Sequence, residues 1–306
     1  MKKKKNKSNK NYNNNDNNNN NSKSIIPSNP KNYIPFEELS KFPENEDFVE
    51  LMKKISILIK ISDNWNNNME AINLLRRLLK FNKILFCTNF DAHFKYISTN
   101  YLNSPRSCLV KLSLILIGEI FTEIISYTKL HDWIDFLIPI IIKKNVLDKN
   151  FIQEEAKNVL NNFSKNIHCT EGLLIFLKII QDRNLKYSSK AYEFFLDLTE
   201  EISADKLKNK NNKTGIKWEF IFRELIEIAK IKKDPYPKRS KNIFSIFLKK
   251  LGIEFMEKLI NDMLNLEDYL HFSKTDMISF SEISRKIIQN EIGNQNGTGN
   301  FESKSK

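Results

Sequence analysis

The stretch Leu130–Ile167, LHDWIDFLIPIIIKKNVLDKNFIQEEAKNVLNNFSKNI, decides the fold. Its first half places apolar residues at helical spacing between Trp133 and Lys144, and its second half repeats this pattern from Phe151 to Phe163. The polar segment 145–150 between the halves is short enough to be a turn between antiparallel helices. Because one helical hairpin cannot bury its own apolar face, it needs similar hairpins on both sides. The stretch therefore predicts one unit of a solenoid.

Further hairpins of the same kind are predicted before and after this stretch. Ser104 is predicted to be an N-cap with Pro105 as the first residue of its helix, and Thr170 is a second predicted N-cap. The expected helix pairs cover residues 48–61 and 69–81, 86–101 and 105–127, 170–181 and 188–202, and 218–231 and 239–251, and a last helix at 255–269 caps the stack.

The spacing of the turns supports a repeat protein. The turn centres, at positions 65, 105, 149, 186 and 235, are 40, 44, 37 and 49 residues apart. These intervals bracket the period of roughly 40–47 residues that is typical of HEAT and armadillo repeats. We therefore predict an all-α fold, an α-solenoid of about five HEAT-type helical hairpins with a C-terminal capping helix.

Composition divides the chain into a repeat domain and two tails. Residues 1–32 hold eight Lys and one Asp among many Asn, and such a segment has too few apolar side chains to offset the entropy of ordering. We predict a disordered tail at 1–32, a repeat domain at 45–270 and a second disordered tail at 290–306. With only 7 Gly and 8 Pro in the chain, the middle lacks the turn residues that an all-β fold needs.

The sequence predicts a soluble cytoplasmic protein. The basic N-terminus lacks the apolar region of a signal peptide, and the most apolar run, 112–125, is interrupted by Glu119 and Glu123. Three scattered cysteines, Cys87, Cys108 and Cys169, are expected to be reduced thiols.

Motifs for catalysis are missing from the sequence. The glycines of the repeat region stand alone, so no glycine-rich phosphate loop is predicted, and the four histidines lack metal-ligand spacing. We therefore expect no enzymatic activity, no cofactor and no bound metal.

Three local patterns point to one family. Trp65 stands in a turn before the helical pattern MEAINLLRRLL, the segment 106–111 reads RSCLVK, and the segment 148–156 reads DKNFIQEEA. Together they resemble TOG domains, which are built from HEAT repeats, and in particular the CLASP N-terminal region and crescerin-type ciliary proteins. The resemblance covers about residues 45–270.

The resemblance implies a partner and a binding edge. TOG domains are flat paddles whose turns within successive repeats line one thin edge, and this edge meets the αβ-tubulin heterodimer. The sequence departs from the family pattern at two places. Asn66 follows the tryptophan, and Asn67, Asn68 and Met69 stand where the family usually has a basic residue just beyond it. The fifth turn, around Pro235, is stiffer than is typical of the family. Carried over to the matching positions, the tubulin-binding residues are Trp65, Arg106, Lys149, Lys186, Lys232, Lys233, Lys238 and Arg239.

Charge favours the same edge. Residues 203–241 hold twelve Lys or Arg against five Asp or Glu, so the positive charge of the repeat region is concentrated around the fifth turn. Tubulin is strongly acidic, and a basic edge would speed encounter and fix orientation. The predicted function is a microtubule-associated, cytoskeletal module, and the alternative is a HEAT-repeat scaffold for other proteins.

The sequence also bears on nucleic acid and membranes as partners. The Lys2–Lys5 run suggests nuclear import or nucleic-acid binding, but the tail lacks interleaved aromatic residues, so nucleic acid is not the expected partner. No membrane partner is expected, and the sequence leaves the oligomeric state open because no heptad segment is present.

Overall fold

The computed structural model describes residues 33–60, 64–124, 128–209, 216–264 and 281–290. Contacts between Cα atoms separate the chain into Met1–Tyr33 and Ile34–Lys306, and the helices below all belong to the second unit. The predicted tail 1–32 and residues 291–306 of the predicted tail 290–306 lie outside the described residues, as do residues 265–269 of the predicted capping helix. Within the described residues, no helix is both long and apolar enough to cross a membrane.

The described residues contain helices and no strand, which confirms the all-α class. The helices are α1 (Phe48–Lys60), α2 (Trp65–Phe81), α3 (Lys83–Thr88), α4 (Phe90–Tyr96), α5 (Ser107–Glu123), α6 (Thr128–Leu147), α7 (Asn150–Asn166), α8 (Cys169–Ile180), α9 (Leu185–Glu201), α10 (Ala204–Lys208), α11 (Trp218–Lys230), α12 (Tyr236–Leu251) and α13 (Ile253–Leu264). A 3-10 turn η1 (Phe36–Glu38), a π-helix η2 (Ile97–Tyr101) and a helix at 281–290 complete them.

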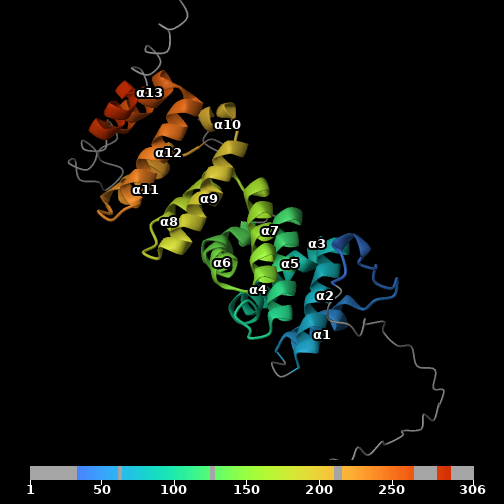
Figure 1. Cartoon of the computed structure of the whole chain (residues 1–306). Coiled ribbons are helices and arrows are strands. Elements are labelled where there is room, and N and C mark those ends of the chain that lie inside the picture. Colours follow the sequence, from blue (N-terminus) through green and yellow to red (C-terminus); the bar gives the residue numbers. More distant parts are fainter. Residues whose placement is uncertain (1–32, 61–63, 125–127, 210–215, 265–280, 291–306) are drawn as a thin grey trace, which may run out of the picture. The chain divides into compact units, whose positions relative to one another are not determined.

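Successive helices pair as hairpins, and the hairpins stack in chain order (Figure 1). The pairs are α1 with α2, η2 (which follows α4) with α5, α6 with α7, α8 with α9, and α11 with α12. The second helix of each of the first three pairs contacts the second helix of the next pair, so α2, α5, α7 and α9 follow one another. Between the fourth and fifth pairs, α8 packs on α11. This is the predicted stack of HEAT-type hairpins.

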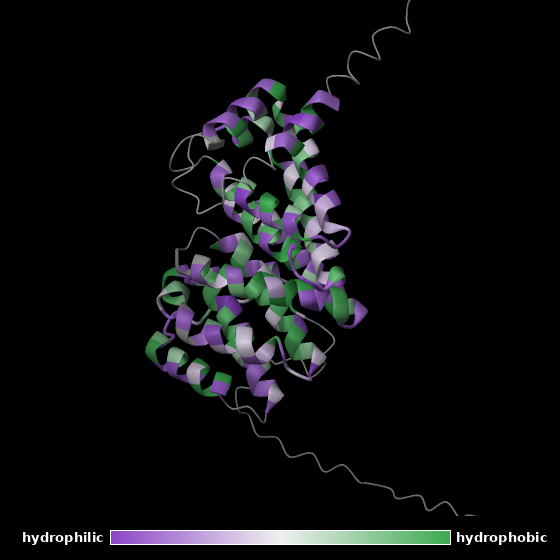
Figure 2. Cartoon of the chain, turned by 90° about the vertical axis from the view of Figure 1, so that its left-hand side faces the viewer, coloured by the Kyte–Doolittle hydropathy of each residue, from purple (hydrophilic) through white to green (hydrophobic). Residues whose placement is uncertain are grey.

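The core forms where each helix turns its apolar stripe toward its neighbours. On α7 the buried residues Ile152, Ala156, Val159, Leu160 and Phe163 follow helical spacing, as the opening stretch predicted. Helix α5 is buried on more sides because it lies between α2 and α7, so its apolar residues run almost continuously. Hydrophobic and hydrophilic residues accordingly alternate along the helices in Figure 2.

The largest boundary difference lies in the second hairpin. The predicted single helix at 86–101 is three pieces, α3, α4 and η2, because the side chain of Asn82 caps α3 at its start and Asn89 ends it. Helix α5 begins at Ser107 rather than Pro105. The Ser104 hydroxyl accepts a hydrogen bond from the Arg106 amide, and Arg106 itself has extended backbone angles.

Smaller differences concern the other turns. Helix α8 begins at Cys169 with His168 rather than Thr170 as its N-cap, and α9 begins at Leu185 because Asn184 caps it. Helix α6 continues to Leu147, three residues beyond the predicted end. The segment after residue 203 contains the short helix α10, which Ser203 caps and whose Leu207 is buried.

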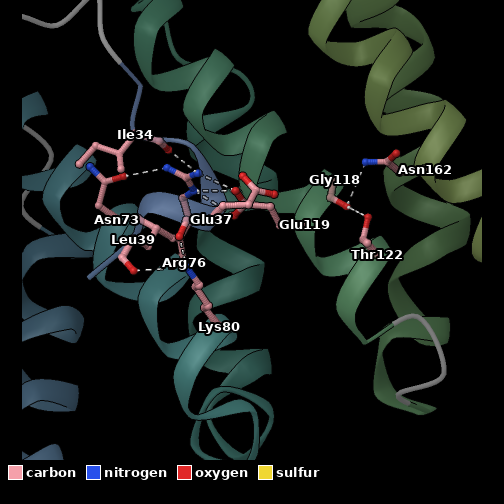
Figure 3. Close-up of polar contacts among 10 residues, drawn as sticks. All are labelled: Ile34, Glu37, Leu39, Asn73, Arg76, Lys80, Gly118, Glu119, Thr122 and Asn162. Carbon is pink, nitrogen blue, oxygen red and sulfur yellow. Dashed lines mark hydrogen bonds and ion pairs between the residues drawn. The ribbon is translucent and has the colours of Figure 1, made fainter. Parts of the chain in front are cut away.

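The segment before α1 is fastened to α2 by polar contacts (Figure 3). Arg76 donates to both carboxylate oxygens of Glu119 on α5, with its shortest contact at 2.6 Å, and to the carbonyl oxygen of Ile34 at 2.9 Å. The ammonium group of Lys80 donates to the carbonyl oxygen of Glu37 at 2.6 Å. Burial raises the pKa of Glu119, while the hydrogen bond and charge of Arg76 act in the opposite direction. Arg76 therefore joins three parts of the chain.

Replacing Arg76 by alanine is expected to lower the free energy of unfolding by about 3 to 5 kcal/mol, because the Glu119 carboxylate loses its partner inside the protein. Urea denaturation measures the change. The matched control is Lys53→Ala, which removes an exposed ion pair with Glu50 and is expected to cost less than about 0.5 kcal/mol. Equal losses for the two variants would contradict this role of Arg76.

His93 on α4 predicts a loss of stability in mild acid. Burial lowers its pKa below the ordinary value of 6.5; the hydrogen bond to the Asn89 carbonyl raises it and the charge of Lys60 lowers it further. Because the unfolded chain binds this proton more readily than the folded one, unfolding becomes easier as the pH falls below 6.5. The free energy of unfolding of the wild type should fall between about pH 7 and pH 5, and His93→Gln should show a smaller fall. Parallel pH profiles for the two proteins would contradict this.

Candidate functional site

The turns inside the five hairpins lie next to one another and form what we call the turn row, residues 64–66, 103–107, 148–150, 181–186 and 231–238. Each of the helices α2, α5, α7, α9 and α12 begins at one of these turns. A side-chain contact at or beside the turns joins every consecutive pair of them, as the next paragraphs describe. The described parts of the five turns therefore form one continuous row.

The first three turns are joined through the predicted binding residues themselves. The Arg106 guanidinium lies over the Trp65 ring, 5.7 Å from its centroid, which is within the range of a cation–π contact. Arg106 is exposed and Trp65 is half-buried. In the next turn, the ammonium group of Lys149 donates a hydrogen bond of 2.9 Å to the Ser107 hydroxyl. The structure therefore brings Trp65, Arg106 and Lys149 together.

The third, fourth and fifth turns are joined by aromatic residues. The Lys143 ammonium lies 5.8 Å from the centroid of the Tyr187 ring, which links the end of α6 to the start of α9. The Tyr236 hydroxyl donates to the carbonyl oxygen of Asp182 at 2.5 Å. Tyr236 is buried, so this contact holds the fifth turn against the fourth.

Arg239 differs from the other predicted site residues because it is buried. Its side chain donates to the Ser188 hydroxyl at 2.5 Å and to the Ser189 hydroxyl at 2.6 Å, and only 8% of the residue is exposed. Burial lowers the pKa of its guanidinium, and the nearby Tyr236 and Tyr192 act in the opposite direction. In this structure Arg239 fastens α12 to α9.

The remaining basic side chains of the row are on the surface. Lys186, Lys232 and Lys233 are exposed, and Lys238 is exposed in an ion pair of 2.7 Å with Asp234. The sequence analysis missed Arg183, which is exposed in the fourth turn and could have been found from its place three residues before Lys186. The row carries seven basic residues, Arg106, Lys149, Arg183, Lys186, Lys232, Lys233 and Lys238, against Asp148, Asp182 and Asp234.

The row can bind an acidic protein surface. Its basic side chains attract carboxylates, and Trp and Arg are the side chains that most often anchor protein interfaces. The part of the chain that the structure describes holds no group of three His, Cys, Asp or Glu residues placed to bind a metal ion.

Comparisons with known proteins give similar folds at low sequence identity. No protein-family model and no curated protein matches the chain. A chain from the structure "Structural Basis of Microtubule Plus End Tracking by XMAP215, CLIP-170 and EB1" is 13% identical, with a TM-score of 0.48, over 80% of this chain and 94% of that one. A designed armadillo repeat protein in complex with a (KR)4 peptide is 11% identical, with a TM-score of 0.37, over 76% of this chain and 98% of that one.

These similarities are to helical repeats, and at such identities and TM-scores they assign no function to this chain. The chain has the all-helical architecture of HEAT-type hairpins that the resemblance to TOG domains implied. Any binding function has to be argued from its turn row.

Arg239→Leu is expected to lower the free energy of unfolding by about 2 kcal/mol, since the variant loses two charged hydrogen bonds inside the protein. Urea denaturation provides the measurement, and Lys241→Leu, at an exposed position of the same helix, serves as the control. If both variants were as stable as the wild type, Arg239 would not fasten α12 to α9.

Proposed function

We propose that the chain is a non-catalytic, microtubule-associated module that binds αβ-tubulin through its turn row. The observation that carries this proposal is the continuity of the row. A half-buried Trp65 with Arg106 over its ring stands at one end, and the exposed Lys232 and Lys233 stand in the last turn.

The contacts between turns make the row suited to a large, rigid partner. A surface whose side chains are already held in place loses less conformational entropy on binding than one with mobile side chains. The cation–π contact restrains Arg106, and the hydrogen bond to Ser107 restrains Lys149. These residues can therefore meet a flat protein surface with little rearrangement.

Charge sets the class of partner. Tubulin is strongly acidic, so a row with an excess of basic residues would be attracted to it over a distance of about one Debye length, roughly 8 Å at physiological salt. In a complex like those of the TOG domains that the chain resembles, Lys232 and Lys233 of the fifth turn would face α-tubulin and Trp65 would face β-tubulin. The proposed location is the cytoplasmic microtubule cytoskeleton.

The test is gel filtration and equilibrium binding of the whole chain with free αβ-tubulin. We expect binding by the wild type, and binding at least about tenfold weaker for Trp65→Ala and for the double variant Lys232→Glu/Lys233→Glu. The control is Lys165→Glu/Lys206→Glu, which makes the same charge change at exposed positions outside the row and should leave binding less affected.

Absence of tubulin binding by a folded wild type would overturn the proposal, and so would equal effects of the two charge-reversal variants. Circular dichroism and urea denaturation of each variant show that it remains folded. Raising the salt concentration should weaken binding of the wild type more than binding of Lys232→Glu/Lys233→Glu.

The second candidate is a scaffold that binds other proteins through helix faces. The observation in its favour is Phe136 on α6, which is exposed and packs edge-on against Trp133 with ring centroids 6.3 Å apart. A folded wild type that does not bind tubulin, and that binds another protein in a way that Phe136→Asp abolishes and the turn-row variants leave unchanged, would favour this candidate.

A further inference from the structure

Three exposed apolar side chains stand at the third and fourth turns of the row, two of them flanking the third turn. Leu147 ends α6 and is 58% exposed, and Leu185 begins α9 and is 38% exposed. Phe151, in the first turn of α7, is exposed as well. Large apolar side chains grouped on a surface often mark an interaction site. The sequence analysis treated Phe151 as part of the buried stripe of α7, and its exposure corrects this.

A shallow groove runs between the third and fourth turns. It is formed by the end of α6 and the first two turns of α9, and its lining is mainly apolar beside the basic side chain of Lys186. Glu193 also lines the groove and forms an ion pair of 2.5 Å with Lys190, which neutralises its charge. The groove is lined by Asn145, Val146, Leu185, Lys186, Ser189, Lys190 and Glu193.

One polar atom of the groove lacks a partner. The Asn145 side chain is 8% exposed, and its amide nitrogen donates a hydrogen bond of 2.8 Å to the carbonyl oxygen of Gln153. The amide oxygen of the same side chain is buried and accepts no hydrogen bond from the described residues. Because this oxygen is shut off from solvent, a ligand in the groove does not contact it unless the Asn145 side chain moves.

The basic residues around the groove favour a ligand that carries carboxylates. Lys186 lines the groove, and Arg183 is exposed in the same turn. A partner segment that places carboxylates on both sides of an apolar side chain would match this arrangement. A second copy of this chain docking turn row to turn row would set basic residues against basic residues, which disfavours a dimer through this face.

We propose that this groove anchors an apolar side chain from an acidic loop of the partner protein. The loop's carboxylates would lie against Lys186 and Arg183. This inference rests on the proposed binding of tubulin through the turn row, and it adds that the affinity depends on an apolar anchor at the centre of the row.

The experiment compares two neutral substitutions of exposed leucine and isoleucine residues. Leu185→Ser removes an apolar side chain from the lining of the groove at the first residue of α9, and Asn184 remains the N-cap of that helix. Ile84→Ser makes a similar change at α3, outside the turn row, where the side chain is 84% exposed. Equilibrium binding to αβ-tubulin should be about tenfold weaker for Leu185→Ser and unchanged for Ile84→Ser.

A photo-reactive benzoylphenylalanine at position 185 gives an independent readout. With αβ-tubulin present, we expect a cross-link to a tubulin segment that contains Asp or Glu residues next to an apolar residue. A cross-link between two copies of this chain, or to a segment without acidic residues, would overturn the inference.

The outcomes separate the two proposals. If the wild type does not bind tubulin, the proposed function fails. If the wild type binds and depends on Lys232 and Lys233 but Leu185→Ser binds equally well, only the apolar anchor fails. Equal weakening by Leu185→Ser and Ile84→Ser would likewise overturn the anchor, because the effect would then not belong to the groove.

Discussion

The packing of one hairpin against the next is the constraint on which the structure depends. No single hairpin here can bury its apolar stripe by itself, and α5 shows this most clearly because α2 and α7 both cover it. The approach of α5 to α7 is close enough that a Cβ atom at Gly118 would lie 3.4 Å from the Asn162 side chain. Stacking in chain order follows, and with it the alignment of the turns.

Polar clamps add specificity to this apolar stack. Arg76 joins α2, α5 and the segment at Ile34, and Arg239 joins α12 to α9. Each is a buried cation whose hydrogen bonds are made in the native arrangement, so a shifted helix would leave a charge without partners at a cost of several kcal/mol. The clamps therefore fix how neighbouring hairpins sit in register.

The same stacking determines what the surface can do. Turns that are far apart in the sequence become neighbours, and their basic, aromatic and apolar side chains combine into one continuous row. A partner that binds this row meets several turns at once, which is why a rigid, acidic protein surface suits it better than a small ligand. The groove between the third and fourth turns adds an apolar contact at the centre of this basic edge.

The sequence by itself determined the all-α class, the hairpin period and the position of most turns, because helical periodicity and turn residues are local signals. The sequence also predicted that Trp65 and Arg106 lie at the first and second turns, because the residues around these turns favour turns locally. Only the tertiary structure decided that Arg239 is buried, that Phe151 and Leu185 are exposed, and that the Asn145 amide oxygen accepts no hydrogen bond from the described residues. Whether a residue near a helix end is buried depends on how closely the neighbouring hairpin approaches it. This distance cannot be predicted from the local sequence pattern.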